Sequence, residues 1–322
     1  MTHTVVVTDH DFEDLSIERS VLGHLAEVVE LTDDVGETAE DVEETLAAAD
    51  AVINLRYDVD ADAIAVMDDV RVISRYGIGV DNVDVDAAAD RDIPVTNVPD
   101  YCLEEVSTHA LALLLSMARS VPRYDRSVER GEWNRDVGTP VHRFSTRTVG
   151  VVGYGAIGRE VGARAASLGA DVLASDPFLS ADDLADDPAD LVAFEELLER
   201  ADFVSVHSPL TDDTRGLFDA EAFARMKDSA YLVNVARGPI VDGDALLDAL
   251  NAGEIAGAGL DVFPDEPPAA DAPLRDHDRV VATPHVAWYS EEANEERRRT
   301  VAEIVASVLS GGEPWNVVNG VE

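Results

Sequence analysis

The sequence contains one cysteine, Cys102, and no long apolar run. A single cysteine excludes an intrachain disulfide and a cysteine metal cluster, and we expect Cys102 to pack rather than act as a nucleophile. The longest apolar run, residues 110–118, is far shorter than the roughly 20 residues of a membrane span. Residues 4–9 have a short strand pattern without the basic region of a signal peptide. These absences predict a cytoplasmic protein without a membrane span or a metal site.

Positive charge is also scarce, since 24 Lys and Arg residues face 66 Asp and Glu residues and give a net charge of −42. Lys227 is the only lysine. Nucleic-acid binding needs a basic surface, and an anionic membrane would repel this chain. The one cationic run, residues 297–299, lies among glutamates, and we interpret it as a solvated helix face with ion pairs. We expect neither nucleic acid nor a membrane as a partner.

The acidity does not indicate disorder, because 46% of the residues are hydrophobic and can form a core. Acidic residues occur along the whole chain, which is typical of adaptation to molar salt. There the Debye length falls to about 3 Å and self-repulsion is screened. We interpret the sequence as halophilic; the alternative is an acidic mesophilic protein.

Short β-branched runs alternate with helical patterns, which predicts parallel sheets covered by helices on both faces. Strands are expected at residues 5–7, 51–55, 70–74, 94–97, 148–152, 171–174, 203–207, 231–235, 258–262 and 280–283. Long helices are expected at residues 103–119 and 291–309, the second with Ser290 as N-cap. Residues 182–190 form an acidic patch that we expect to be mobile. The pattern predicts two α/β units with a cleft between them and a boundary near Pro99.

A glycine-rich turn follows the strand expected at residues 148–152 and opens the next helix. Its residues are Gly153, Tyr154, Gly155, Ala156, Ile157 and Gly158. Glycine suits the tight turn at 153, the close approach of a pyrophosphate at 155 and the helix–strand packing at 158. The helix N-terminus favours the pyrophosphate charge. The alternative is a glycine-rich turn without a ligand.

Asp176 ends the following strand, 18 residues after Gly158, where an acidic residue accepts the ribose hydroxyls of NAD. Its charge would repel a 2′-phosphate, and residues 177–179 contain no arginine to receive one. We therefore expect NAD rather than NADP. The alternative for Asp176 is a surface carboxylate.

Arg237, Glu266 and His285 each follow a predicted strand, so they are expected to converge at the carboxyl edge of the sheet. The arginine fork suits the carboxylate and carbonyl of a 2-oxo acid. A histidine oriented by a glutamate suits proton exchange with the developing alkoxide. Each residue alone is also compatible with a surface ion pair or a structural histidine.

Five segments together resemble the D-isomer-specific 2-hydroxyacid dehydrogenase family over essentially the full chain. They are residues 77–84, 153–158, 206–211, 234–238 and 283–285. The resemblance implies two doubly wound domains, Rossmann-like and flavodoxin-like, with NAD as cofactor. It implies that Arg237 binds the substrate, that Glu266 supports His285, and that His285 is the acid/base. It also implies that the amides of Ile78 and Gly79 hold the substrate carboxylate. His207, Val235, Ala236 and Asp261 would lie near the nicotinamide side.

The family resemblance revises the domain boundaries. It implies a discontinuous substrate domain, residues 1–98 with 288–322, and an NAD-binding domain, residues 99–287. The crossings near residues 99 and 287 would be hinges. The helix after Pro99 would belong to a dimerisation region, so a homodimer is expected.

Residues 285–290 resemble the branch that contains the C-terminal-binding-protein corepressors, in which Trp288 would face an apolar or thioether substrate side chain. Trp288 as a core residue is the alternative. A phosphoglycerate dehydrogenase is the competing enzyme, because Arg56 and Arg75 lie where that subgroup places its anion-binding arginines. An NAD-sensing binding protein without essential catalysis is a third hypothesis.

Overall fold

The computed structural model describes residues 2–31 and 39–321. The chain divides into two compact units. Unit 1 is Met1–Cys102 with Ser290–Glu322, and unit 2 is Leu103–Tyr289. Each unit contains one sheet, and the strands that pair within it are parallel. The sequence prediction of two parallel-sheet α/β domains is confirmed.

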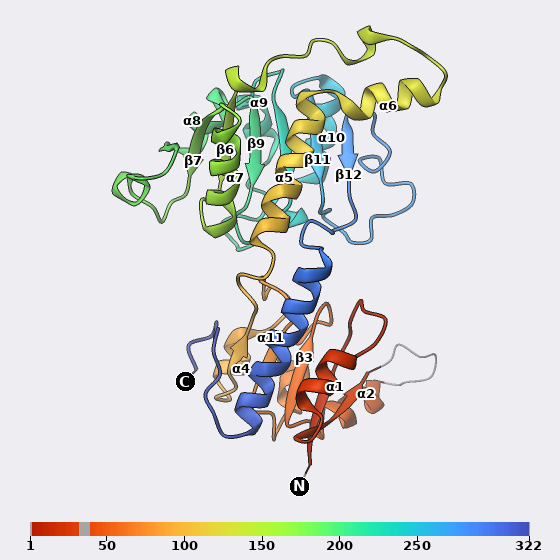
Figure 1. Ribbon diagram of the computed structural model, residues 1–322, viewed down its shortest axis with the longest axis vertical. Helices are drawn as coiled ribbons and strands as arrows, with labels where there is room; N and C mark the ends of the chain where they lie inside the picture. The colour runs from red at the N-terminus through yellow and green to blue at the C-terminus, as the bar shows by residue number, and fades with distance from the viewer. Residues whose placement is uncertain (1, 32–38, 322) are drawn as a thin grey trace. The chain divides into compact units, whose positions relative to one another are not determined.

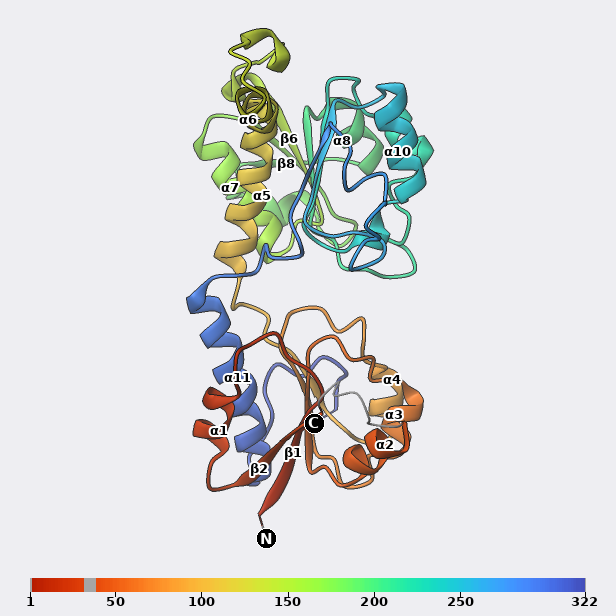
Figure 2. The same ribbon diagram turned by 90° about the vertical axis from the view of Figure 1, so that its right-hand side faces the viewer.

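Unit 1 has a five-stranded sheet in the order β2-β1-β3-β4-β5, which is the flavodoxin-like order. Helices α1 and α11 lie side by side on one face, and α2, α3 and α4 cover the other (Figures 1 and 2). The strands are β1 His3–Val7, β2 Ala26–Glu30, β3 Ala51–Asn54, β4 Ile73–Arg75 and β5 Val95–Thr96. The helices are α1 Ser16–Leu22, α2 Ala39–Ala47, α3 Ala61–Ala65, α4 Val85–Ala89 and α11 Glu291–Leu309.

Unit 2 has a seven-stranded sheet in the order β12-β11-β10-β9-β6-β7-β8, which is the Rossmann order with one added strand. Helices α5 and α7 lie on one face, while α8 and α10 lie on the other (Figure 2). The strands are β6 Thr148–Val152, β7 Asp171–Ser175, β8 Ala189–Leu191, β9 Phe203–Val206, β10 Tyr231–Asn234, β11 Gly257–Leu260 and β12 Val280–Ala282. The helices are α5 Leu103–Ala118, α6 Val121–Glu129, α7 Ala156–Ser167, α8 Phe194–Arg200, α9 Ala220–Arg225 and α10 Gly243–Ala252.

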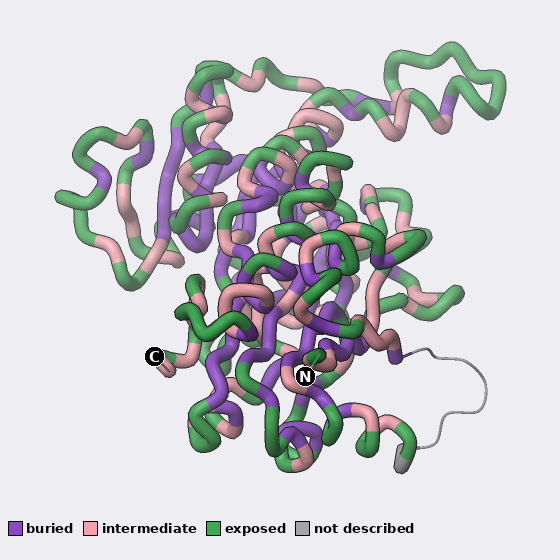
Figure 3. The backbone as a smooth tube through the Cα atoms, turned by 60° about the horizontal axis from the view of Figure 1, so that its bottom comes forward, coloured by how far each residue is buried: buried purple, intermediate pink, exposed green. Residues whose placement is uncertain are grey.

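The central strands are mostly buried, and Figure 3 colours the whole chain by the burial of each residue. Strands β3 and β9 are buried at every residue, because helices cover both sides of a parallel sheet. Cys102 is 2% exposed and is a packing residue, as expected. Ser290 caps α11 by accepting from the Ala293 N–H, which confirms the predicted N-cap. Among the described residues, no helix is both long and apolar enough to cross a membrane.

The edge strands β2 and β8 were missed by the sequence patterns. Acidic residues, Glu27 and Glu30 in β2 and Asp190 in β8, break the apolar run that marks a buried strand. Residues 182–190, which we expected to form a mobile patch, lie partly in regular structure. This segment contains the 3-10 helix Ala181–Leu184 and strand β8, which pairs with β7. Arg159 of α7 forms an ion pair with Asp187, which links this segment to α7.

The interpretation of residues 297–299 as a solvated face is wrong. Arg297 and Arg298 are only 1% and 7% exposed, and Arg299 alone pairs along the surface, with Glu295. Helix α11 packs against α1, so two of three consecutive residues face the interior of unit 1. Sequence spacing on one helix could not show the partners, because these lie near the start of the chain.

The buried arginines bind carboxylates in and before α1. Arg298 donates to both Glu18 oxygens, from Nε at 2.9 Å and from Nη2 at 2.7 Å, and Glu18 is 0% exposed. Arg297 donates to Asp11 Oδ1 at 2.6 Å. Both guanidinium groups lie over the Phe12 ring, a cation–π arrangement. The last helix is thereby fixed to the first loop and helix of the chain.

Tyr76 completes the buried cluster by donating its hydroxyl to Glu18 Oε1 at 3.0 Å. Burial, followed by the nearby Glu18 charge, raises the pKa of Tyr76 well above its usual value. The hydroxyl therefore stays protonated at neutral pH and remains a donor. Glu18 thus receives three hydrogen bonds without contact with solvent, which compensates for its desolvation.

Replacing Arg298 with alanine should lower the free energy of unfolding by about 3–5 kcal/mol, because Glu18 would keep a buried charge without its bidentate partner. Arg299→Ala on the same helix is the matched control and should change it by less than about 1 kcal/mol, because that pair is exposed. Urea denaturation of both variants measures the difference. Equal losses would contradict the assignment of Arg298 as the buried anchor.

Candidate active site

The glycine turn of unit 2 has the geometry of a dinucleotide-binding loop. Gly153 has φ +83°, and a Cβ there would meet the Ser208 amide nitrogen at 2.5 Å. A Cβ on Gly158 would meet the Gly153 carbonyl oxygen at 2.3 Å. A Cβ on Gly155 would meet nothing within 4 Å. Two glycines are therefore required by the fold, and the third leaves open space at the start of α7.

Helix α7 begins at this open space without a side-chain cap, because its N-cap residue is Gly155. Its first amide N–H groups are thus available for a negatively charged group, and the helix dipole favours one there. Ala156 and Ile157 form this first turn. The Tyr154 side chain is buried and packs against Gly162, so the residue contributes to the loop through its backbone.

Asp176 follows β7 and faces the glycine loop. Its Oδ2 accepts from the Tyr154 N–H at 2.9 Å, and its Oδ1 accepts from the Phe178 N–H at 3.0 Å. Each carboxylate oxygen keeps a second acceptor position, which suits two ribose hydroxyls. The open Gly155 turn, the uncapped helix and Asp176 together fit NAD.

His207 follows β9 and lies beside the glycine loop, where its backbone N–H donates to the Val152 carbonyl at 2.8 Å. Its Nε2 lies 2.8 Å from the Ser205 hydroxyl. Desolvation lowers the pKa of His207 to about 3, so its ring is neutral at physiological pH.

Arg237 lies in a tight turn after β10. The buried Asn234 side chain holds this turn by donating to the Arg237 carbonyl at 2.9 Å and accepting from the Ala236 N–H at 3.0 Å. A Cβ on Gly238 would lie 1.8 Å from the Phe263 carbonyl oxygen, so only glycine permits this contact. The contact brings the Arg237 turn against the segment that leads to Glu266.

Glu266 and His285 form a direct pair, with 2.6 Å between Glu266 Oε2 and His285 Nδ1. Glu266 Oε1 also accepts from the Phe263 N–H at 2.9 Å. Burial by itself raises the pKa of Glu266, but the hydrogen bond and charge of His285, the Phe263 N–H and the Arg237 charge outweigh it and lower the pKa. Because an ionised carboxylate only accepts, Nδ1 carries the proton, and Nε2 is left to exchange one.

The loop after β12 carries His285 in a left-handed conformation, with φ +54°. Three consecutive amides, those of residues 285–287, donate to Asp261, the first to its carbonyl and the others to its carboxylate. The Trp288 indole N–H donates to the His285 carbonyl at 3.0 Å. Asp261 and Trp288 therefore both contact the loop that carries His285.

Ile78 and Gly79 belong to unit 1, in the loop after β4. The Asn97 side chain donates to the Ile78 carbonyl at 2.7 Å, and the Arg75 Nε donates to Asn82 Oδ1 at 2.8 Å. Within the part of the chain that the structure describes, the amides of Ile78 and Gly79 donate to no protein acceptor. These two donors are available to an anion.

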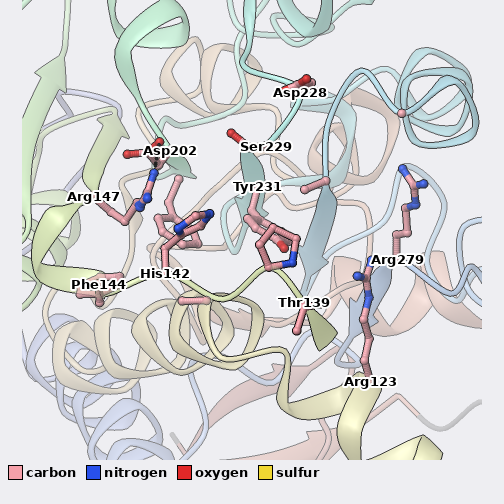
Figure 4. Close-up of a pocket in the computed structure, with 15 residues that line it drawn as sticks. Arg123, Thr139, His142, Phe144, Arg147, Asp202, Asp228, Ser229, Tyr231 and Arg279 are labelled. Atoms are coloured by element: carbon pink, nitrogen blue, oxygen red, sulfur yellow. Dashed lines mark hydrogen bonds and ion pairs between the residues drawn. The ribbon is translucent and has the colours of Figure 1, made fainter. Parts of the chain in front are cut away.

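A pocket of about 410 Å³ lies at the opposite, amino edge of the seven-stranded sheet (Figure 4). Its lining includes Arg147 and Asp202, which directly precede β6 and β9. Burial alone raises the pKa of Asp202, but the Thr148 N–H, Lys227 and Arg147 together lower it. The pocket is separate from the candidate site, because the glycine loop, Arg237 and His285 lie at the carboxyl edge of the same sheet. No group of three or more potential metal ligands occurs among the described residues.

Sequence reasoning missed three contributors. Asn234 and Thr283 lie within the segments 234–238 and 283–285 but were given no role of their own, and His109 was given none. His109 lies on α5, and its Nε2 is 2.9 Å from the Thr283 hydroxyl. Its only sequence signal was its position directly before the apolar run of residues 110–118.

Comparison with known proteins identifies the family. Residues 111–287 match the model for "D-isomer specific 2-hydroxyacid dehydrogenase, NAD binding domain". The chain is 35% identical over 326 residues to a glycerate dehydrogenase of Methylorubrum extorquens, with 99% of both chains covered. The protein belongs to the D-isomer-specific 2-hydroxyacid dehydrogenase family, and unit 2 contains its NAD-binding domain.

Two further similar proteins have other names. A D-3-phosphoglycerate dehydrogenase of Mycobacterium leprae is 42% identical over 261 residues, covering 81% of this chain and 49% of the relative. The chain thus spans about half the length of that relative. The crystal structure of a D-lactate dehydrogenase from Aquifex aeolicus, complexed with NAD and lactic acid, has a TM-score of 0.86 and 29% identity, with 95% and 96% of the chains covered.

The lowered pKa of His207 predicts a pH dependence of stability. Between pH 6.5 and about 3 the unfolded histidine binds a proton and the folded one does not, so wild-type stability should fall as the pH falls. His207→Gln removes this titration. The free energy of unfolding of the variant minus that of wild type should therefore increase steadily as the pH falls from 7 to 4. Urea denaturation at stepped pH measures it. A difference that does not change with pH would contradict the buried neutral ring.

Proposed function

We propose that the protein is an NAD(H)-dependent D-2-hydroxyacid dehydrogenase that reduces a small 2-oxo acid. The supporting observation is the Glu266–His285 pair, with the Arg237 turn held against the same segment by Gly238. All three residues follow strands at the edge of the sheet that carries the glycine loop. A pure binding role would not require an oriented acid/base pair beside the cofactor site.

Arg237 binds the substrate carboxylate and polarises the C2 carbonyl through its planar guanidinium. NADH, when bound, supplies the hydride that adds to C2. His285 donates the Nε2 proton to the carbonyl oxygen as it becomes an alkoxide, and Glu266 stabilises the imidazolium through Nδ1. In the reverse direction, His285 accepts the proton from the hydroxyl.

The remaining assignments extend this proposal to both units. The substrate domain would be residues 1–98 with 288–322, which largely coincides with unit 1, and the NAD-binding domain would be residues 99–287, which largely coincides with unit 2. The amides of Ile78 and Gly79 would hold the substrate carboxylate, and Trp288 would limit the size of the side chain. Cofactor contacts would come from the glycine loop and from Asp176, His207, Val235, Ala236 and Asp261.

A D-3-phosphoglycerate dehydrogenase is the second candidate, supported by the names of several relatives. Arg56 is a specific feature in its favour, because its side chain is 71% exposed and has one weak ion pair, at 3.5 Å from Asp11. Such an arginine can receive a phosphate. Arg75 is engaged with Asn82 and is less available.

We further propose a cytoplasmic homodimer adapted to high salt. Val121 and Val128 on α6, and Trp133 beyond it, are exposed hydrophobic residues close to the expected dimerisation helix α5. The net charge of −42 supports the salt adaptation. Assays of the protein therefore belong in molar salt.

A panel of 2-oxo acids with NADH at high salt tests the proposed activity. It includes pyruvate, glyoxylate, hydroxypyruvate, branched-chain and thioether acids, and 3-phosphohydroxypyruvate. His285→Ala should lower kcat/KM for the best substrate about 10²–10⁴-fold, because the general acid is lost, whereas His142→Ala, at an exposed residue, should match wild type. Near-normal turnover by His285→Ala would refute the mechanism. Activity confined to 3-phosphohydroxypyruvate would favour the D-3-phosphoglycerate dehydrogenase. No activity with any of the acids would favour the NAD-sensing binding protein.

Asp176 should determine cofactor choice. Wild type should bind NADH more tightly than NADPH in calorimetry, because the carboxylate accepts the ribose hydroxyls and repels a 2′-phosphate. Asp176→Ala should weaken NADH binding by roughly 10- to 100-fold, as expected for a lost charged hydrogen bond. It should also reduce the preference of the protein for NADH over NADPH. Tighter binding of NADPH by wild type would contradict the assignment.

A further inference from the structure

The His285 loop is held in a conformation that its own sequence does not favour. A side chain with a Cβ seldom adopts φ +54°, and it persists there only when its surroundings hold it. The restraint comes largely from one residue, Asp261, which is 1% exposed and follows β11. It receives the His285 N–H at 2.7 Å on its carbonyl, the Val286 N–H at 3.0 Å on Oδ1 and the Ala287 N–H at 2.9 Å on Oδ2.

Thr283 and His109 extend this contact to helix α5. The Thr283 hydroxyl donates to Asp261 Oδ1 at 2.6 Å. A hydroxyl has a single hydrogen, so Thr283 must accept at its contact with His109 Nε2, 2.9 Å away. His109 therefore carries its proton on Nε2, which also lies 3.7 Å from Asp261 Oδ1.

We propose that His109, Thr283 and Asp261 are positioning residues that fix the left-handed His285 loop and aim His285 at Glu266. All of the residues belong to unit 2. The chain of hydrogen bonds runs from α5 through the Thr283 hydroxyl to the Asp261 carboxylate, and from there to three consecutive loop amides. The catalytic consequence rests on the proposed function, whereas the restraint of the loop does not.

Asp261 therefore has a role other than the expected contact with the nicotinamide. Its Oδ1 already accepts from Thr283 and Val286, and its Oδ2 accepts from Ala287. Only one acceptor position, on Oδ2, is left for any further partner. Most of its hydrogen-bonding capacity goes to the loop.

Two pairs of variants separate the hydrogen bonds from packing. Thr283→Val preserves shape and removes the hydroxyl, while Thr283→Ser preserves the hydroxyl. His109→Leu removes the donor, while His109→Gln places an amide N–H near the position of Nε2. Thr108→Val is the matched control, because its exposed hydroxyl bonds only to the preceding turn of α5.

The first readout is amide hydrogen exchange of Val286 and Ala287 in the protein without substrate or cofactor. Thr283→Val and His109→Leu should accelerate this exchange at least tenfold, while Thr283→Ser, His109→Gln and Thr108→Val should stay within about threefold of wild type. Unchanged exchange in Thr283→Val and His109→Leu would overturn the proposal.

The second readout is turnover of the best 2-oxo acid. Thr283→Val should lower kcat roughly ten- to a hundredfold and leave the NADH dissociation constant within about threefold, because His285 is misaligned while the cofactor loop is untouched. Thr283→Ser should restore kcat. A kcat loss without faster exchange, or a loss shared by Thr283→Ser, would contradict a positioning role. Faster exchange in a protein that reduces no 2-oxo acid would refute the proposed function and leave the restraint of the loop standing.

Discussion

Parallel strand direction is the constraint on which the site depends. Because the strands of a parallel sheet share one carboxyl edge, residues that follow different strands become neighbours without being close in sequence. In unit 2, the glycine loop follows β6, Asp176 follows β7, and His207 follows β9. Arg237, Asp261 and His285 follow the next strands in sheet order, β10, β11 and β12. The site is thus assembled by topology before any side chain makes a specific contact.

Two kinds of contact then position the polar side chains of the candidate site. Gly238 permits backbone contact with Phe263, which no larger residue would allow, and so unites the turns that carry Arg237 and Glu266. Asp261 works in the opposite way, since its buried charge gathers the amides of the loop around His285. The missing side chain of Gly238 thus positions Arg237 and Glu266, and the buried carboxylate of Asp261 positions His285.

The sequence predicted those parts of the candidate site whose residues directly follow a strand. The Gly153 turn, Asp176 and the pairing of Glu266 with His285 were all predicted, because each depends on a strand end that periodicity reveals. The burial of Arg297 and Arg298 could not be predicted, because Asp11 and Glu18 lie about 280 residues away in the chain. Strands β2 and β8 were not predicted, because their acidic residues leave no continuous apolar run. His109 was overlooked because its partner Thr283 is 174 residues distant.

The pairing of Arg298 with Glu18 also bears on the order in which the chain folds during synthesis. Unit 2 is one continuous stretch and contains all the strands of its own sheet. Unit 1 includes α11, which follows unit 2 in the chain, so the part of its sheet that α11 covers stays exposed until unit 2 has been synthesised. During that interval the apolar surface that α11 later covers is open to association with other chains.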